Sequence, residues 1–460
     1  MPPSERPVSR RAVLASVGAG LGVGAATEPS AAQETTTESW TLRLGGEGRY
    51  AFRDVAPVED GHVLAGVAPA GETTAAWAVR LVEDRPVWLE TYGGDRPSRA
   101  TCVAATGDGG AVVGGATVAA GTDTERGWVV AVDADGAVRW ERSFSGTRGV
   151  ARSVAVAPNG DVLVVGRAQS GLTGVEGWLV RVTADGDPVY RRTVGRDLQV
   201  ALNAVVVRDG TPLVAGLASR RGNRGDGLLA TVTPSGALAD RRRYDLDGLA
   251  TGVTALVPTD DGTLVAGTHE GPRDHFDLWV ASVDAAGDRR WTATFDRSRR
   301  DRLADAAATP DGGAVLVGRS DERDGSARDL WAVRVGPDGQ KRWGRVLGGP
   351  GDDRGDGVAV SAGAYVVAGT RTTRADGQQG WVVRRSLDDA PPSLLPEPLS
   401  GVGSVGALAG VAGALGMLGL RARRAGRGSG DGAQSRRSCE SRWSRRSRAR
   451  TSVASASVRQ

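Results

Sequence analysis

The chain of 460 residues has little of what most catalytic and cross-linked proteins require. Only two cysteines are present, Cys102 in an apolar segment and Cys439 in an Arg/Ser-rich tail, so no disulfide framework is expected in any compartment. The only imidazoles are those of His62, His269 and His275. No HExxH, GxSxG, P-loop or CxxC motif occurs, which argues against the common hydrolases and redox enzymes.

Long helices are not expected either. The sequence contains 68 glycines and 21 prolines, and both residue types predict frequent turns. Hydrophobic residues make up 40% of the chain and occur in short Val, Ala and Leu runs that end at Gly, Asp or Asn, as strands do. The fold class predicted from these patterns is all-β.

The charge is unevenly distributed. Residues 421–460 contain twelve arginines and two acidic residues, a local charge of +10. The segment 1–33 carries +1. Because the whole chain carries +4, residues 34–420 carry about −7. The sequence pI of 9.5 therefore describes the tail, and nucleic acid is not an expected partner of the folded part.

The N-terminus has the features of an export signal. Arg10 and Arg11 precede a Gly-rich, weakly apolar stretch, and Ser30-Ala31-Ala32 precedes Gln33. Residues 1–32 thus resemble a twin-arginine signal peptide with a small-residue cleavage site. The resemblance implies export of a folded chain across a prokaryotic membrane; the alternative is a short buried helix.

An uncharged segment near the other end predicts a membrane anchor. Residues 399–420 contain no charge, are followed by Arg421, Arg423 and Arg424, and are long enough to cross about 30 Å of hydrocarbon. The alternative is a Gly-rich linker. A Pro-rich linker at 389–398 ends in Pro-Glu-Pro, and this order resembles the PEP-CTERM sorting signal cut by exosortases. In that family the signal ends the chain, whereas here a tail, 421–460, follows, which we expect to be disordered.

The middle of the chain repeats one unit. A position held mostly by tryptophan recurs once in each repeat unit, at a nearly constant interval. In most units a second position, also held mostly by tryptophan, follows the first at a constant short distance. The first series is Trp77, Trp128, Trp178, Leu228, Trp279, Trp331 and Trp381; the second is Trp40, Trp88, Trp140, Tyr190, Arg241, Trp291 and Trp343. Each unit contains four short strands, which we label a, b, c and d in chain order, and this period is typical of a β-propeller.

The count of strands predicts seven blades. Residues 36–388 open on a lone d strand at Trp40, continue through six complete units, and end on a c strand at Trp381. Pairing the first strand with the last would complete the seventh blade and remove the exposed edges of an open row of sheets. We expect a monomeric, seven-bladed propeller with four antiparallel strands per blade, closed by its N-terminal outer strand.

The tryptophans are interpreted as packing between blades, because their regular recurrence serves a structure better than a single binding site; an aromatic ligand platform is the alternative. Gly136, Gly186, Gly287 and Gly339 are expected at positive φ in the c–d turns. The order VDxxGxxxW at Val132 to Trp140 resembles the tryptophan-docking repeat of quinoprotein-like propellers, and the DGxxVVxG strand resembles bacterial and archaeal surface propellers. Quinoprotein dehydrogenases usually have eight blades and vicinal cysteines, so no quinone cofactor is expected here.

Two groups of residues are candidate sites. The segment THEGPRDHFDLW holds His269, Glu270, Asp274, His275 and Asp277 in one b–c loop, a set that could bind a divalent metal or be ordinary loop polarity.

The second group follows the repeat. A small polar residue stands at a nearly constant distance before the glycine that closes each b strand: Asp54, Thr101, Ser153, Asn203, Thr254, Asp305 and Asp356. The simpler interpretation is that each caps the local d–a turn. The alternative is that Asp54, Asp305 and Asp356, from neighbouring blades, share a cation such as Ca²⁺ at the mouth of the central channel.

These observations favour an exported, membrane-anchored propeller at the extracytoplasmic face, acting as a non-catalytic module that binds a protein or glycan through its loops. The runner-up is a polysaccharide hydrolase or lyase that uses carboxylates at the channel mouth. A third hypothesis is a scaffold subunit of an envelope assembly complex. No cofactor other than the possible Ca²⁺ is expected.

Overall fold

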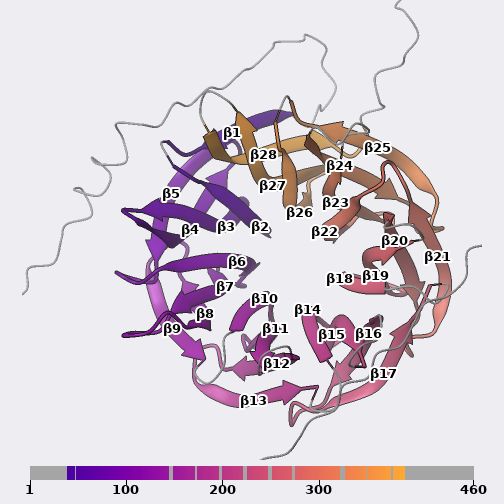
Figure 1. Ribbon diagram of the computed structural model, residues 1–460, viewed down its shortest axis with the longest axis horizontal. Coiled ribbons are helices and arrows are strands. Elements are labelled where there is room, and N and C mark those ends of the chain that lie inside the picture. Colours follow the sequence, from indigo (N-terminus) through magenta and orange to yellow (C-terminus); the bar gives the residue numbers. More distant parts are fainter. Residues whose placement is uncertain are drawn as a thin grey trace, which may run out of the picture. The chain divides into compact units, whose positions relative to one another are not determined.

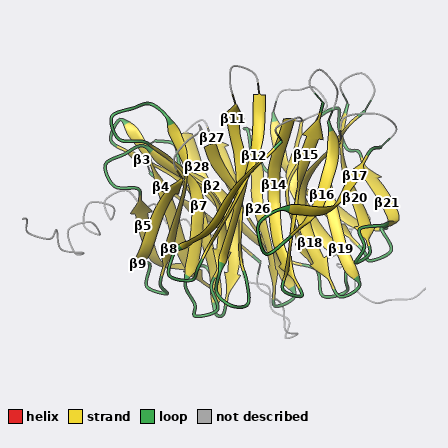
Figure 2. Ribbon diagram, turned by 90° about the horizontal axis from the view of Figure 1, so that it is seen from below, coloured by secondary structure: helices red, strands yellow, loops and turns green. Residues whose placement is uncertain are grey.

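Seven four-stranded antiparallel sheets are arranged around a central opening, as the blades of a seven-bladed β-propeller (Figure 1). The computed structural model describes residues 39–388, except 47, 145–148, 171–173, 196–198, 221–224, 247–250, 272–274, 322–326, 350 and 374–376. All secondary-structure elements of this part are strands. Their connecting turns gather on two opposite faces (Figure 2). The predicted fold class is confirmed.

Each blade has its a strand at the centre and its d strand at the rim (Figure 1). From blade 1 to blade 7, the a strands are β2 (Ala51–Val58), β6 (Ser98–Ala105), β10 (Gly149–Val156), β14 (Gln199–Arg208), β18 (Thr251–Thr259), β22 (Asp301–Ala308) and β26 (Arg354–Ser361). The b strands are β3 (Gly61–Ala70), β7 (Ala111–Val118), β11 (Val162–Ser170), β15 (Thr211–Ser219), β19 (Gly262–Glu270), β23 (Ala314–Asp321) and β27 (Ala364–Thr373). The c strands are β4 (Thr73–Val82), β8 (Glu125–Val132), β12 (Gly174–Val182), β16 (Asp226–Val232), β20 (Phe276–Val283), β24 (Arg328–Val335) and β28 (Gly377–Ser386). The d strands are β5 (Arg85–Tyr92), β9 (Val138–Phe144), β13 (Pro188–Val194), β17 (Leu238–Tyr244), β21 (Arg289–Phe295), β25 (Lys341–Leu347) and, in blade 7, β1 (Trp40–Leu44).

The ring is closed by its first strand. β1 pairs antiparallel with β28, from Trp40 opposite Arg384 to Leu44 opposite Gly380, and so becomes the outer strand of blade 7. The innermost strands β2 and β26 are also in contact. The closure predicted from the strand count is confirmed, and blade 7 is built from both ends of the described chain.

The predictions for the two ends of the chain lie outside the described residues. They are the signal at 1–32, the linker at 389–398, the membrane span at 399–420 and the tail at 421–460. Within the described part of the chain, no helix has the length and apolar character needed to cross a bilayer.

The hydrophobic core lies between blades. It divides into seven clusters, each filled by side chains from two neighbouring blades. The c-strand tryptophans are central to these layers. Trp128 and Trp279 are among the largest fully buried side chains, and the ring of Trp77 stacks on Phe52 at 4.7 Å. Packing between blades, as predicted, accounts for this series of rings.

The d-strand aromatic side chains dock on the next blade. Trp140 lies against Gly186 in the c–d turn of blade 3 and donates its Nε1–H to the carbonyl of Ala184 at 2.7 Å. Trp88 makes the same contact with Gly136 and donates to Ala134 at 2.9 Å. These turn glycines therefore serve two purposes. They supply the positive φ expected from the sequence, +83° at Gly186, and they leave room for the ring of the preceding blade.

Blade 4 departs from this pattern. The sequence spacing assigned Arg241 to the docking position, but Arg242 lies against Gly287. Arg242 pairs with Leu229 as Arg142 pairs with Val129 in blade 2, and Arg142 likewise contacts the turn glycine of the next blade, Gly186. The place of Trp140, four residues after the turn glycine, is held in blade 4 by Asp240, which has no ring to dock and takes a φ of +44° at the irregularity of this ladder.

Replacing Gly186 by alanine tests the docking contact. The added Cβ would lie 2.6 Å from the Trp140 ring at a φ of +83°. We expect the free energy of unfolding to fall by about 2–4 kcal/mol, from strain and overpacking together. Gly210→Ala is the matched control, because Gly210 has a φ of +73° and no atom within 4 Å of the added carbon. Chemical denaturation followed by circular dichroism should show the larger loss for Gly186→Ala; equal losses would contradict the docking role.

Candidate functional site

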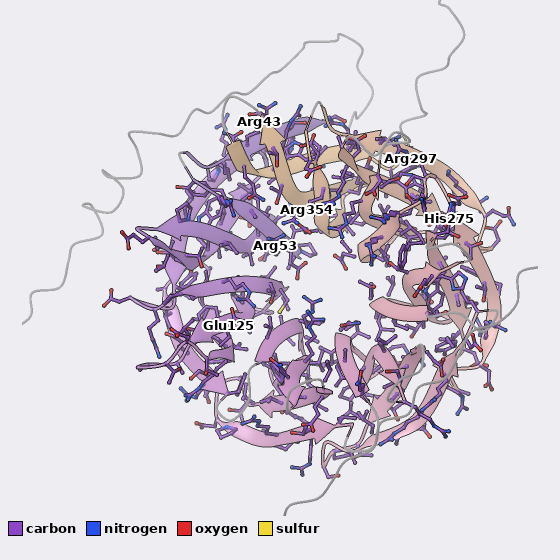
Figure 3. The ribbon with its side chains drawn as sticks, in the orientation of Figure 1. Arg43, Arg53, Glu125, His275, Arg297 and Arg354 are labelled. Carbon is purple, nitrogen blue, oxygen red and sulfur yellow. The ribbon has the colours of Figure 1, made fainter. Side chains whose placement is uncertain are left out.

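A cavity of about 640 Å³, open to solvent, lies at the hub and is lined mainly by the innermost strands. Arg53 and Arg354 flank the central opening (Figure 3). All seven small polar residues identified from the repeat line this hub cavity. They lie within the a strands, and not at the strand entrances where a turn-capping role would place them.

The seven residues occupy two different registers. Every a–b ladder contains a bulge, at which the pairing skips one residue of the a strand. Thr101, Asn203, Thr254 and Asp356 are skipped residues. Asp54, Ser153 and Asp305 instead come one residue after the skipped position.

The length of the a–b hairpin loop explains why the seven residues occupy two registers relative to the bulge. This loop has two residues in blades 1, 4, 5 and 7 and is longer in blades 2, 3 and 6, which moves the bulge further from the b-strand glycine. In blades 3 and 6 the constant spacing from that glycine therefore identifies Ser153 and Asp305, whereas the residues at the bulge are Arg152 and Ala304. In blade 2 the glycine opposite the c-strand tryptophan Trp128 is Gly115, one residue after the Gly114 used in the sequence pattern. This offset compensates for the longer loop, so the pattern still identifies the skipped residue, Thr101. In blade 1 the choice of Asp54 rested on its small polar side chain and missed Arg53 at the bulge.

These side chains join neighbouring blades. The amide of Val103 in blade 2 donates to Asp54 of blade 1 at 2.8 Å, and Thr101 in turn donates to the carbonyl of Ala151 in blade 3 at 2.6 Å. Similar bonds link blades 3 to 4, 4 to 5 and 6 to 7: Val205 to Ser153, Asn203 to Val253 and Val358 to Asp305. The expectation of purely local turn caps is wrong, because the a strands converge closely enough for a short side chain to reach the next backbone.

The three hub carboxylates differ in their partners. Burial raises the pKa of Asp54, and its neighbour Asp305 raises it further; burial also raises the pKa of Asp305. Burial raises the pKa of Asp356 to about 6, against the opposing effect of arginines. Asp356 Oδ2 lies 3.1 Å from Arg53 Nη1 and 2.9 Å from Arg354 Nε. Thus Asp54 and Asp305 interact with each other, whereas Asp356 is an ion-pair partner of two arginines.

Two groups of arginines lie at the hub, and the sequence interpretation did not include them. Burial lowers the pKa of Arg152, which lines the cavity, and Arg167 and Arg99 lower it further. Burial and then Arg319 lower the pKa of Arg302, and these two arginines are directly opposite each other in the β22–β23 ladder. Within each group the arginines repel one another, although Arg99 also forms an ion pair with Glu125. These groups were missed because arginine holds no constant place in the repeat.

The histidine-containing loop is rearranged relative to expectation. Among the described residues, one set of three potential metal ligands has its ligand atoms within 4.8 Å of one another: His275, Asp277 and Asp296. Asp296 follows the adjacent strand β21 and was missed because it is distant in sequence. His269 is buried and lies 3.3 Å from the Thr251 hydroxyl, and Asp274 is outside the described residues.

The raised pKa values of the hub predict a pH dependence of stability. An aspartate whose pKa is higher in the folded protein favours folding in acid, and this contribution is lost as the pH rises from the unfolded value near 4 through the folded value, about 6 for Asp356. Asp305→Asn removes one such group and retains a carbonyl for the Val358 amide. We expect this variant to lose less stability than wild type between pH 5 and pH 7.5, measured by chemical denaturation. Asp108→Asn, at a site whose pKa is lowered to about 2, is the control; the same pH slope in wild type and Asp305→Asn would contradict the assignment.

The cation site on Asp54, Asp305 and Asp356 stays a prediction. It implies that titration of the purified protein with Ca²⁺ releases or absorbs heat and raises the melting temperature. Asp305→Asn should abolish both effects. A titration without heat and without a melting shift would discard the site.

The fold has relatives among solved structures, at low identity. No family model and no curated protein matches the chain. The polysaccharide lyase Uly1 is 10% identical, with 75% of this chain and 92% of that chain covered and a TM-score of 0.49. The propeller domain of the Trilobed protease from Pyrococcus furiosus is 9% identical, covering 74% and 96%, with a TM-score of 0.45. Puromycin hydrolase is 17% identical, with a TM-score of 0.45; the match covers 71% of this chain and 50% of that protein. These similarities concern the propeller fold and select no activity.

Proposed function

We propose that the protein is an exported, membrane-anchored binding module without catalytic activity, which takes an anionic protein or glycan at its hub. The observation that carries the proposal is a pair of mutually repelling arginine groups, Arg152 with Arg99 and Arg167, and Arg302 with Arg319. Arg99, Arg152 and Arg302 line the same cavity. An anion bound between such groups would relieve their repulsion.

The arginine groups cost stability in the free protein. Like charges placed directly opposite each other on adjacent strands, as Arg302 and Arg319 are, destabilise a sheet. The general charge of the folded part does not account for them, since residues 34–420 carry about −7. The hub cavity is lined by four arginines and three aspartates, and Arg99 also pairs with Glu125, so Arg152 and Arg302 are the two arginines that would favour a specific anionic ligand over general attraction to polyanions.

The position of the arginines supports binding of a large ligand. Arg99 and Arg302 are each the second residue of an a strand, and the b strands end at the same face because the sheets are antiparallel. The site therefore opens toward the face that carries the d–a and b–c turns, whose sequences vary from blade to blade. A rigid ring supporting variable turns is a common basis for recognition of macromolecules.

A second candidate function is a polysaccharide hydrolase or lyase. Asp54 and Asp305 favour it, because both line the cavity and both have a raised pKa, as a general acid requires. Each, however, accepts a backbone N–H from the neighbouring blade, which supplies a structural reason for its position. Export and membrane anchoring are part of the proposal and rest on the sequence features of the two ends of the chain. A scaffold subunit of an envelope assembly complex is a further alternative.

The double variant Arg152→Gln with Arg302→Gln tests the hub. We expect its affinity for polygalacturonate, an anionic glycan, or poly-glutamate, an anionic polypeptide, to fall at least tenfold, with a smaller dependence of affinity on salt. Its melting temperature should stay the same or rise, because repulsion is removed. Biolayer interferometry and thermal denaturation provide the two measurements.

The control is Arg85→Gln, at an arginine whose side chain is 85% exposed on the rim. It should bind both polymers as wild type does. Equal affinity of wild type and the double variant would contradict binding at the hub, and turnover of either polymer, lost in Asp305→Asn, would favour the enzyme.

A further inference from the structure

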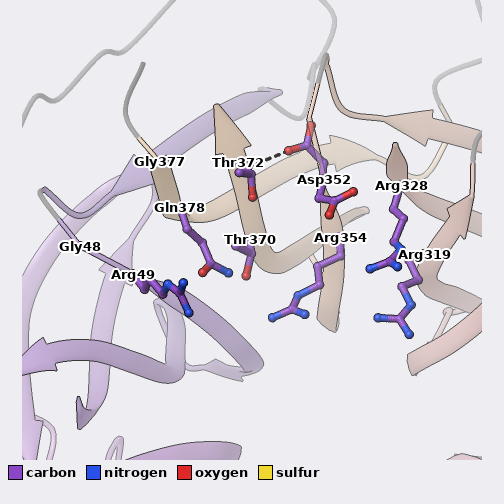
Figure 4. A pocket seen from close by; sticks show the side chains of 11 residues that line it. Gly48, Arg49, Arg319, Arg328, Asp352, Arg354, Thr370, Thr372, Gly377 and Gln378 are labelled. Atoms are coloured by element: carbon purple, nitrogen blue, oxygen red, sulfur yellow. Dashed lines mark hydrogen bonds between the residues drawn. The ribbon is translucent and has the colours of Figure 1, made fainter. Parts of the chain in front are cut away.

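A second cavity, of about 500 Å³, lies beside the hub at the junction of blades 6, 7 and 1 (Figure 4). We call it the seam pocket. Its lining comes from the turn before β2, from β23 and β24, from the turn before β26, and from β26, β27 and β28. Arg354 connects the two cavities, since it lines the seam pocket and pairs with Asp356 of the hub at 2.9 Å.

Four arginines line the seam pocket: Arg49, Arg319, Arg328 and Arg354 (Figure 4). Arg354 forms an ion pair with Asp356, with 2.9 Å between Nε and Oδ2. Among the described residues, Arg328 forms one ion pair, with Asp321 at 3.6 Å. The guanidinium groups thus provide several N–H donors at one wall, the arrangement that binds a carboxylate or another oxyanion.

Two buried oxygens of the same pocket have no hydrogen-bond partner among the residues that the structure describes. Thr370 is 2% exposed, and its hydroxyl has no partner in the described part of the chain. Asp353 is 1% exposed; its Oδ1 accepts the Thr372 amide at 3.0 Å, but its Oδ2 accepts no hydrogen bond and lies 3.9 Å from Arg371 Nε. An unsatisfied buried polar atom costs about 1–3 kcal/mol, so two in one pocket need an explanation.

We infer that the seam pocket binds one anionic sugar unit, a hexuronate, of a glycan that also crosses the hub. The sugar carboxylate would lie among the arginines, and its hydroxyl groups would donate to Asp353 Oδ2 and bond with the Thr370 hydroxyl. Sulfate has no hydroxyl group to donate to Asp353 Oδ2, and a neutral sugar leaves the arginines without an anionic partner. The volume is in the range of small-ligand pockets. This inference rests on the proposed binding function and specifies its ligand.

Thr370→Val separates recognition from folding. Because the hydroxyl has no partner in the free protein, the isosteric valine should keep or raise the melting temperature. We expect the same variant to bind trigalacturonate at least tenfold more weakly. Thr292→Val is the matched control, since the Thr292 hydroxyl is also buried and unpaired but is not part of the seam pocket. It should leave trigalacturonate binding unchanged.

The probe itself is tested by calorimetry with three ligands: trigalacturonate, its methyl ester, which has the same rings without charge, and inorganic sulfate. Wild type should bind the acid at least tenfold more tightly than the ester or sulfate. Equal binding of acid and ester, binding of sulfate at the strength of the acid, or no effect of Thr370→Val would overturn the inference.

Polygalacturonate binding by wild type and by the Arg152→Gln, Arg302→Gln variant is measured in parallel. If the polymer binds at the hub and Thr370→Val binds trigalacturonate as wild type does, only the seam-pocket inference fails. If trigalacturonate binds as expected but the hub variant retains polymer affinity, only the hub proposal fails.

Discussion

The antiparallel pairing of β1 with β28 is the constraint on which the rest of the structure depends. The strand that opens the described chain hydrogen-bonds to the strand near its end, from Trp40 opposite Arg384 to Leu44 opposite Gly380. Without this pairing blade 7 would lack its outer strand and the ring would have free edges. The hub cavity exists only because all seven a strands are held at one radius, so the residues that line it depend on this closure.

Two sets of contacts between blades then define the ring at its rim and at its centre. At the rim, Trp140 and its equivalents dock on turn glycines of the next blade. At the centre, short polar side chains such as Asp54 and Thr101 hydrogen-bond to the next a strand. Both sets act between neighbours, and the apolar clusters lie between them. A stable frame of this kind can tolerate residues that are unfavourable for folding.

The arginines and the unpaired oxygens are such residues. Arg302 opposite Arg319, and the unpaired atoms of Thr370 and Asp353, each oppose folding in the free protein. These groups lie at two cavities that are linked by the ion pair between Arg354 and Asp356. In natural proteins, locally unfavourable groups tend to gather where a ligand is bound. This placement is the reason for proposing one extended anion-binding surface that runs from the hub to the seam of the ring.

The sequence by itself determined the number of blades, their strand order, the closing strand and the role of the tryptophans. These follow from the regular period of the repeat and from the unequal strands at the two ends, which are properties of local pattern. Only the tertiary structure decided which side chains meet. The longer hairpin loop of blade 3 moves the bulge by one position, so Arg152 occupies the place that spacing had assigned to Ser153. In the same way, Asp296 joins His275 across two strands, and Arg319 opposes Arg302 across another pair. Such contacts depend on the register of paired strands and on the approach of neighbouring strands. Neither can be read from the spacing of residues along the sequence.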